Sequence, residues 1–359
     1  MKKVLLLLTI VVIIPVFSII CSADEGADKY ISEFESIVPD GAFDGDLDME
    51  ELQDALGLES FISELLVCLN NEKGKIISFL ATLIGSLVLL ALSSSVSGPF
   101  CTAVTAAVGT VVSISIFFSV YGVFSSVIDA VNEANDFFAA LIPITVGITS
   151  LGGGAFVAGA QATGMALTSA AVSKLWGTAF TSVSGLGLSM ALISAYGGHI
   201  ADAVSRWVKK TLAWFLGIAT AAIAGTLSLQ TMVASVRDTA AMRAAKYAAS
   251  GMIPVVGSTV SSALSTLASG ISYVKGVVGG GSVFVLISLL LSPLVMILLY
   301  RLSLSFVSFL AEFFEVAAAS KIFGVYLNSL DNVITVYSVS SLIYVFEIIL
   351  FVKSGVALL

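Results

Sequence analysis

The stretch VGGGSVFVLISLLLSPLVMILLY, residues 278–300, carries no charged side chain and is long enough to cross a lipid bilayer. A transmembrane helix needs about 20 mostly apolar residues, because each residue rises 1.5 Å through roughly 30 Å of hydrocarbon. Five further stretches meet the same criterion: 76–97, 100–122, 178–197, 211–234 and 333–352. The sequence therefore predicts an all-α, polytopic integral membrane protein.

Composition agrees with this fold class. Hydrophobic residues make up 58% of the chain and charged residues only 11%, whereas an ordinary soluble domain carries about 25% charged residues. The formal net charge of −8 comes from the N-terminal part, where 15 of the 24 acidic residues lie between Asp24 and Glu72. The remainder of the chain is weakly basic and apolar, so the two parts are predicted to lie in different environments.

The N-terminus has the order of an export signal. Lys2 and Lys3 precede the apolar run 4–20, and cleavage after Ala23 would leave an acidic N-terminus. We therefore expect a signal peptide at 1–23, an acidic extracytoplasmic segment at 24–75 and a polytopic membrane domain at 76–359. An uncleaved anchor is the alternative, because the apolar run is only slightly short for a span.

Two apolar stretches, 137–172 and 250–281, contain many helix-breaking residues. The first holds Pro143, Gly152, Gly153, Gly154, Gly159 and Gly164, and the second holds Gly251, Pro254, Gly257, Gly270, Gly279, Gly280 and Gly281. In lipid every backbone polar group needs a partner, so interrupted helices persist only where protein or a water-filled cavity covers them. With them the sequence predicts about seven to nine membrane segments, and we expect the two broken stretches to form the protein-facing interior.

Basic residues leave the topology open around 211–234. Arg206, Lys209 and Lys210 precede this span, and Arg237, Arg243 and Lys246 follow it. Under the positive-inside rule, either one cluster lies outside or the span re-enters the membrane around Gly225. Residues 301–327 are predicted to form an amphipathic helix along the membrane or against a neighbour.

The chain lacks the motifs of the common membrane enzymes. It has no nucleotide-binding GxxxxGK[ST] sequence, no cysteine and histidine set at zinc-ligand spacing, and no basic stripe with interleaved aromatics for nucleic acid. We therefore predict no enzymatic activity, no catalytic residues, no metal and no cofactor. Glu347 is the one acid predicted to lie deep in a span, where acids are functional by default. Pairing with Lys353 near the helix end, or snorkelling to the interface, is the structural alternative.

The run RDTAAMRAAKYAASGMIPVVG, residues 237–257, resembles the signature of the stage III sporulation protein AE family. Asp238, Arg243, Lys246, Pro254 and Gly257 match that signature, whereas Thr239 stands where the family has glycine. The likeness extends over roughly residues 137–352. We expect the charged residues of this run to form a cytoplasmic loop that docks a partner or anionic lipid headgroups.

The resemblance implies a non-catalytic protein of the mother-cell membrane that surrounds the forespore. It implies a role in a trans-envelope, feeding or secretion-like channel complex that supports late forespore gene expression. The implied partners are other membrane proteins of the same sporulation operon and a forespore protein; a homo-oligomer is left open. The alternative function is a self-sufficient, permease-like secondary transporter, which broken helices suit equally well.

Overall fold

The computed structural model describes residues 28–39, 58–96, 100–152, 154–180, 185, 187, 189, 190, 193, 199–252 and 257–354. These residues are almost entirely helical. In chain order the elements are α2 (Asp28–Glu35), α4 (Leu58–Ser94), α5 (Cys101–Leu151), α6 (Ala155–Lys174), the short π-helix η1 (Leu175–Phe180), α8 (His199–Met252), α9 (Gly257–Phe313) and α10 (Ala317–Lys353). The described part of the chain contains no strand, which confirms the all-α prediction.

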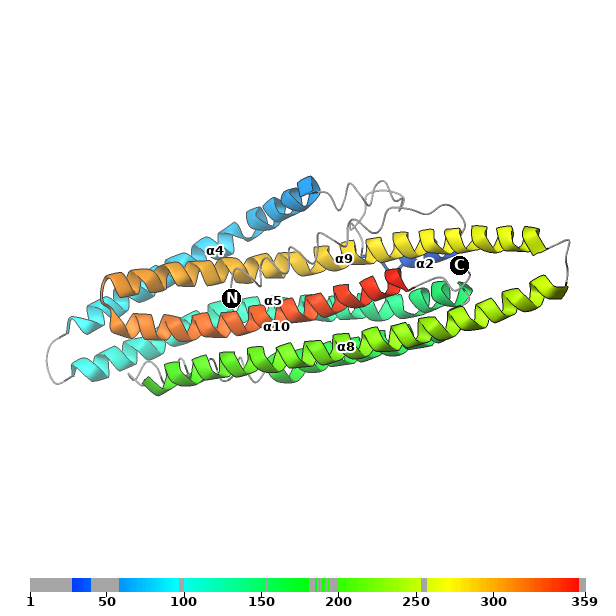
Figure 1. Cartoon of the computed structure of the whole chain (residues 1–359). Helices are drawn as coiled ribbons and strands as arrows, with labels where there is room; N and C mark the ends of the chain where they lie inside the picture. The colour runs from blue at the N-terminus through cyan, green and yellow to red at the C-terminus, as the bar shows by residue number, and fades with distance from the viewer. Residues whose placement is uncertain are drawn as a thin grey trace.

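The long helices lie side by side in an elongated bundle (Figure 1). α5 and α6 form one hairpin, and α9 and α10 form another that packs lengthwise on α5. α8 packs against α6 and α10, and α4 against α9 and α5. The short helix α2 lies on α5 and α9, with Phe34 buried against Phe137.

Six helices of the described chain are long and apolar enough to cross a membrane: Leu65–Ser94, Cys101–Leu151, Ala155–Gly177, Ala203–Ala241, Ser269–Phe313 and Ala317–Lys353. The number of seven to nine segments is not confirmed. Most of the predicted span 178–197 lies outside the described residues, as do the signal peptide and much of the acidic segment. α4 runs through residue 75 unbroken, so its first turns and the first span are one helix.

Three helices are much longer than a single crossing requires. α5, α8 and α9 contain 51, 54 and 57 residues, which corresponds to roughly 80 Å each at 1.5 Å per residue. The hydrocarbon core is only about 30 Å thick. Each of these helices therefore extends well beyond one hydrocarbon layer, and the exposed acids of α5, Asp129, Glu133 and Asp136, lie on such an extended helix.

The helices are broken at fewer places than their glycines and prolines predict. α5 continues through Pro143 to Leu151, and α6 continues through Gly159 and Gly164. The first stretch is interrupted only around Gly152 and Gly154. Buried side chains on both sides of Pro143, including Leu141 and Ile144, hold that helix against its neighbours, and tertiary packing of this kind overrides a local breaker.

The second stretch, 250–281, also has fewer breaks among its described residues than its glycines and prolines predict. α9 runs unbroken from Gly257 to Phe313 through the three glycines 279–281 and Pro293. The glycines are buried, and a Cβ at Gly279 would overlap the side chain of Val352 on α10. They allow two helices to approach closely, which is the usual role of small residues in membrane helices. Pro254 lies outside the described residues.

One of the two topology alternatives is excluded, and the prediction for residues 301–327 is wrong. α8 is one continuous helix through Gly225, so residues 211–234 are not re-entrant, and both basic clusters lie on that helix. Residues 301–327 are not a separate surface helix: they form the end of α9, the turn around Glu315 and the start of α10. Glu315 has φ 57, the left-handed conformation that lets the chain reverse direction there.

Candidate functional site

Asp238 of α8 caps the N-terminus of α6. Its carboxylate accepts hydrogen bonds from the backbone N–H groups of Phe156, at 3.0 Å, and Val157, at 2.8 Å. These donors belong to the first turn of α6, where backbone N–H groups have no partner inside the helix. Asp238 is only 3% exposed, so its negative charge is stabilised by these donors and by the positive end of the helix dipole.

Lys275 of α9 has the opposite role at the C-terminus of α10. Its ammonium donates to the backbone carbonyl of Ser354, at 3.0 Å, and to the Ser354 hydroxyl, at 2.9 Å. It also lies over the ring of Phe351, 5.6 Å from the centroid. The negative end of a helix dipole favours a cation, and the aromatic face adds a cation–π attraction. The buried lysine is therefore matched to the end of α10.

Side chains of α5 and α6 connect to this lysine through Ser354. The Thr149 hydroxyl donates to Gln161 Oε1 at 2.7 Å, and Gln161 Nε2 donates to the Ser354 hydroxyl at 3.0 Å. The Ser354 hydroxyl donates in turn to the carbonyl of Phe351. We call Thr149, Gln161, Asp238, Lys275 and Ser354 the polar belt. It joins α5, α6, α8, α9 and α10 at one end of the bundle.

Residues of the polar belt lie around the break between α5 and α6 and pair with its backbone. Gly154 lies between Thr149 and Asp238: its backbone N–H donates to the Thr149 carbonyl at 3.1 Å, and a Cβ there would lie 3.6 Å from the Asp238 carboxylate. Backbone N–H groups on both sides of this break are thus paired with protein groups. Described parts of the two glycine-rich stretches meet here, because Gln161 and Lys275 both bind Ser354.

A second charged cluster, the Asp331 triad, holds α8, α9 and α10 together. Asp331 of α10 pairs with Lys209 of α8 and Arg301 of α9. Nearby, Asn328 of α10 donates to Ser205 of α8 at 3.1 Å. An apolar helix pair alone gains little from association in lipid, so such polar contacts fix which helices are neighbours.

Glu347 of α10 is buried without an ion-pair partner in the described chain. It is 4% exposed, and its Oε2 has no hydrogen-bond partner. Its other oxygen faces Gly164 of α6, where a Cβ would be 2.6 Å away. Lys353 is exposed and forms no ion pair with Glu347, so the predicted alternative of pairing with Lys353 is wrong. No group of the described chain therefore neutralises a charge on Glu347.

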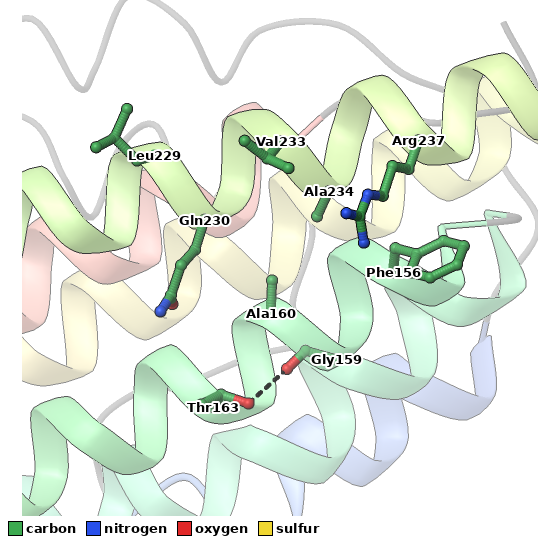
Figure 2. Close-up of a pocket in the computed structure, with 9 residues that line it drawn as sticks. All are labelled: Phe156, Gly159, Ala160, Thr163, Leu229, Gln230, Val233, Ala234 and Arg237. Carbon is green, nitrogen blue, oxygen red and sulfur yellow. Dashed lines mark hydrogen bonds between the residues drawn. The ribbon is translucent and has the colours of Figure 1, made fainter.

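A groove of about 490 Å³ lies on the outside of the bundle between α6 and α8. Figure 2 shows its two walls, α6 with Gly159, Ala160 and Thr163 and α8 with Leu229, Gln230 and Val233. The Gln230 side chain points towards α6, whereas Leu229 and Val233 point away from it. At one end Arg237 lies over the ring of Phe156, 5.8 Å from the centroid. The small residues of α6 leave this space open, and nothing lies within 4 Å of a Cβ built on Gly159.

The charged residues of the family signature do not form a loop. Asp238 and Arg243 lie on the continuous helix α8, Asp238 buried and Arg243 exposed. Lys246 belongs to the same helix and Gly257 begins α9. The expected loop was wrong because Gly251 and Pro254 come later than these charges, and the alanine-rich run between them favours helix. Docking by Arg243 and Lys246 stays a prediction.

Sequence reasoning missed most of the polar belt. Lys275, Gln161 and Thr149 were not singled out, although a lysine or an amide within an apolar stretch is costly and so indicates a specific partner. Asp331 was not singled out either, although the same argument applies to it. The signal was available in the sequence as isolated polar residues, but the identity of each partner required the fold.

The family described as Stage III sporulation protein AE (spore_III_AE) matches residues 44–355, nearly the whole chain. No curated protein and no solved structure matches the chain. The family match includes the polar belt, the Asp331 triad, Glu347 and the groove, and it confirms the resemblance found in residues 237–257. The chain therefore belongs to the stage III sporulation protein AE family.

Proposed function

We propose that the chain is a non-catalytic membrane subunit of a trans-envelope channel complex that links the mother cell and the forespore and supports late forespore gene expression. Its place would be the mother-cell membrane around the forespore. Its partners would be membrane proteins of the same operon and a forespore protein. Membership of the family makes it a stage III sporulation membrane protein, and the proposal adds a role within an assembly.

The observation that carries this proposal is the groove between α6 and α8. Only 11% of the apolar window of α8 is buried in the bundle, against 56% for α9. The wall of the groove that α8 forms is not purely apolar, because Gln230 and Arg237 lie in it beside exposed Leu229 and Val233. Lipid tails offer no hydrogen bonds to an amide or a guanidinium, whereas a neighbouring transmembrane protein does.

The charges inside the bundle support a subunit more than an enzyme or a carrier. Asp238 and Lys275 cap helices, and Asp331 is paired with two bases. Groups held in this way stabilise a fixed structure and are poorly suited to bind and release an ion in each cycle. A self-sufficient transporter is the second candidate, and one observation favours it: Glu347 is a buried acid without such a partner.

Site-specific photocrosslinking in sporulating cells tests whether the groove holds another subunit. A photoreactive amino acid at Leu229 or Val233, which are 65% and 53% exposed, should give crosslinks to a second polypeptide. The same amino acid at Leu227, a leucine on the same helix that is 2% exposed, is the matched control and should give none. Mass spectrometry of the crosslinked product should identify a protein of the same operon or a second copy of the chain.

Crosslinks from 229 and 233 only to lipid, in cells that sporulate normally, would contradict the proposal. The face of α8 would then be an ordinary lipid-facing surface, and the groove would carry no argument for an assembly.

A further inference from the structure

Glu347 lies between two sets of hydrogen-bonded groups on the α6–α10 interface. Towards the end of the bundle, Gln161 of α6 binds Ser354 of α10. In the other direction, Asn135 of α5 accepts hydrogen bonds from Ser169 of α6, at 2.8 Å, and from Tyr344 of α10, at 3.0 Å. Helices α6 and α10 thus carry polar groups on both sides of Glu347.

Two buried groups between these two sets of hydrogen bonds have no hydrogen-bond partner in the described chain. Glu347 Oε2 and the hydroxyl of Thr168 are buried and form no hydrogen bond in the described chain. Thr168 follows Gly164 by one helical turn, on the same buried face of α6. Gly164 is the residue that gives the Glu347 carboxyl its space, since any Cβ there would collide with it. Leu227 of α8 also packs at this position, and its Cδ2 would lie 2.9 Å from a Cβ built on Gly164.

The surroundings of Glu347 do not stabilise a negative charge. Among the charged groups on the helices packed around α10, Lys275 binds Ser354, Asp238 caps α6, and Glu72 pairs with Lys75; the side chains of Lys174, Lys353, Asp129, Glu133 and Asp136 are exposed. None of these forms an ion pair with Glu347 in the described chain. An unpaired carboxylate in an apolar interior is far more costly than the neutral acid.

We propose that Glu347 is a proton-binding site: it holds a proton as a neutral carboxylic acid in the packed bundle and exchanges it when α6 separates from α10. The ligand is a proton, which adds to one carboxylate oxygen with no other change of bonds. Gln161 and Ser354 towards the bundle end, and Thr168 one turn beyond Gly164 on α6, provide polar groups on both sides of the site along the helices. This inference goes beyond the proposed subunit function and does not depend on any partner.

Dicyclohexylcarbodiimide, an apolar reagent that adds to protonated carboxyl groups, tests the proposal on the full chain in membranes. We expect a stable acylurea at Glu347, detected by peptide mass spectrometry, with labelling that falls as the pH is raised. Glu347→Gln should abolish it. Asp331, which is ion-paired, is the internal control and should stay unlabelled, whereas the exposed Glu312 and Glu315 should react with a water-soluble carbodiimide.

Carbon-13 NMR of the chain with isotope-labelled glutamate provides a measurement that does not depend on reagent access. The carboxyl signal assigned through Glu347→Gln should have the chemical shift of a neutral acid at neutral pH and move to the carboxylate position in alkaline solution. A carboxylate signal at neutral pH would overturn the proposal. So would protection from the carbodiimide by sodium ions at constant pH, because the site would then bind a metal cation.

A functional measurement separates a proton-exchanging site from a fixed neutral acid. Glutamine has the shape of the neutral acid but cannot release a proton, so Glu347→Gln should leave the chain folded in the membrane and cause a loss of heat-resistant spores. Gly324→Ala, on an open position of the same helix α10, is the matched control and should sporulate normally. Normal sporulation of Glu347→Gln would show that proton exchange at this site is not used, and would overturn that part of the proposal.

Discussion

Replacing Asp238 with alanine is expected to destabilise the chain by about 3 kcal/mol, because two hydrogen bonds to a charged acceptor are lost and each is worth about 1.5–3 kcal/mol. The backbone N–H groups of Phe156 and Val157 would then be buried without a partner. Unfolding by denaturant in mild detergent gives the change in free energy. Hydrogen exchange at these two amides should accelerate more than exchange elsewhere in α6.

Two variants serve as controls for Asp238. Asp238→Asn keeps one oxygen acceptor and should lose less stability than the alanine variant. Arg237→Ala changes the neighbouring exposed residue and removes only its contact with the Phe156 ring, worth about 0.5–1 kcal/mol at exposed sites. Equal losses in Asp238→Ala and Arg237→Ala, with unchanged exchange at the start of α6, would show that the cap does not stabilise the helix.

Replacing Asp331 with alanine should also cost about 3 kcal/mol, because the partly buried cations Lys209 and Arg301 would both lose their counter-ion. The value lies at the lower end of the range for buried pairs, since the side chains of Lys209 and Arg301 are 31% and 25% exposed. The measurement is again unfolding in mild detergent. A disulfide trap between α8 and α10 near Ser205 and Asn328 should form less readily in the variant.

Lys210→Ala is the matched control for the Asp331 triad. Lys210 follows Lys209 on α8 but its side chain is exposed, so its loss should change stability by less than about 0.5 kcal/mol. If Asp331→Ala were as stable as the parent chain, the triad would not determine how α8 packs against α9 and α10.

The fold class could be predicted from sequence because the bilayer imposes a simple length and polarity rule. Residues 278–300 and 333–352 were identified by that rule and lie within the long helices α9 and α10. Helix boundaries were predicted less well. Pro143 and the glycines 279–281 are local breakers, but packing on neighbouring helices outweighs their cost, and sequence alone does not reveal that packing.

The candidate site was predictable only in part. Asp238 was selected through the family signature, and Glu347 as an acid within an apolar span. The partners that define their roles lie far away in sequence: Asp238 binds the start of α6, and Glu347 faces Gly164. Lys275 was missed because a lysine between glycines and valines has no local pattern, and only the position of the α10 C-terminus explains it.

Purification of the chain from sporulating cells in mild detergent, followed by counting of its copies and partners, tests most directly whether it is a subunit of an assembly. We expect the chain to be recovered in a fixed ratio with other sporulation membrane proteins. A bulky residue in the groove, such as Gly159→Trp, should release them while the chain remains folded. Recovery as a lone monomer that transports a defined solute in liposomes would contradict this expectation.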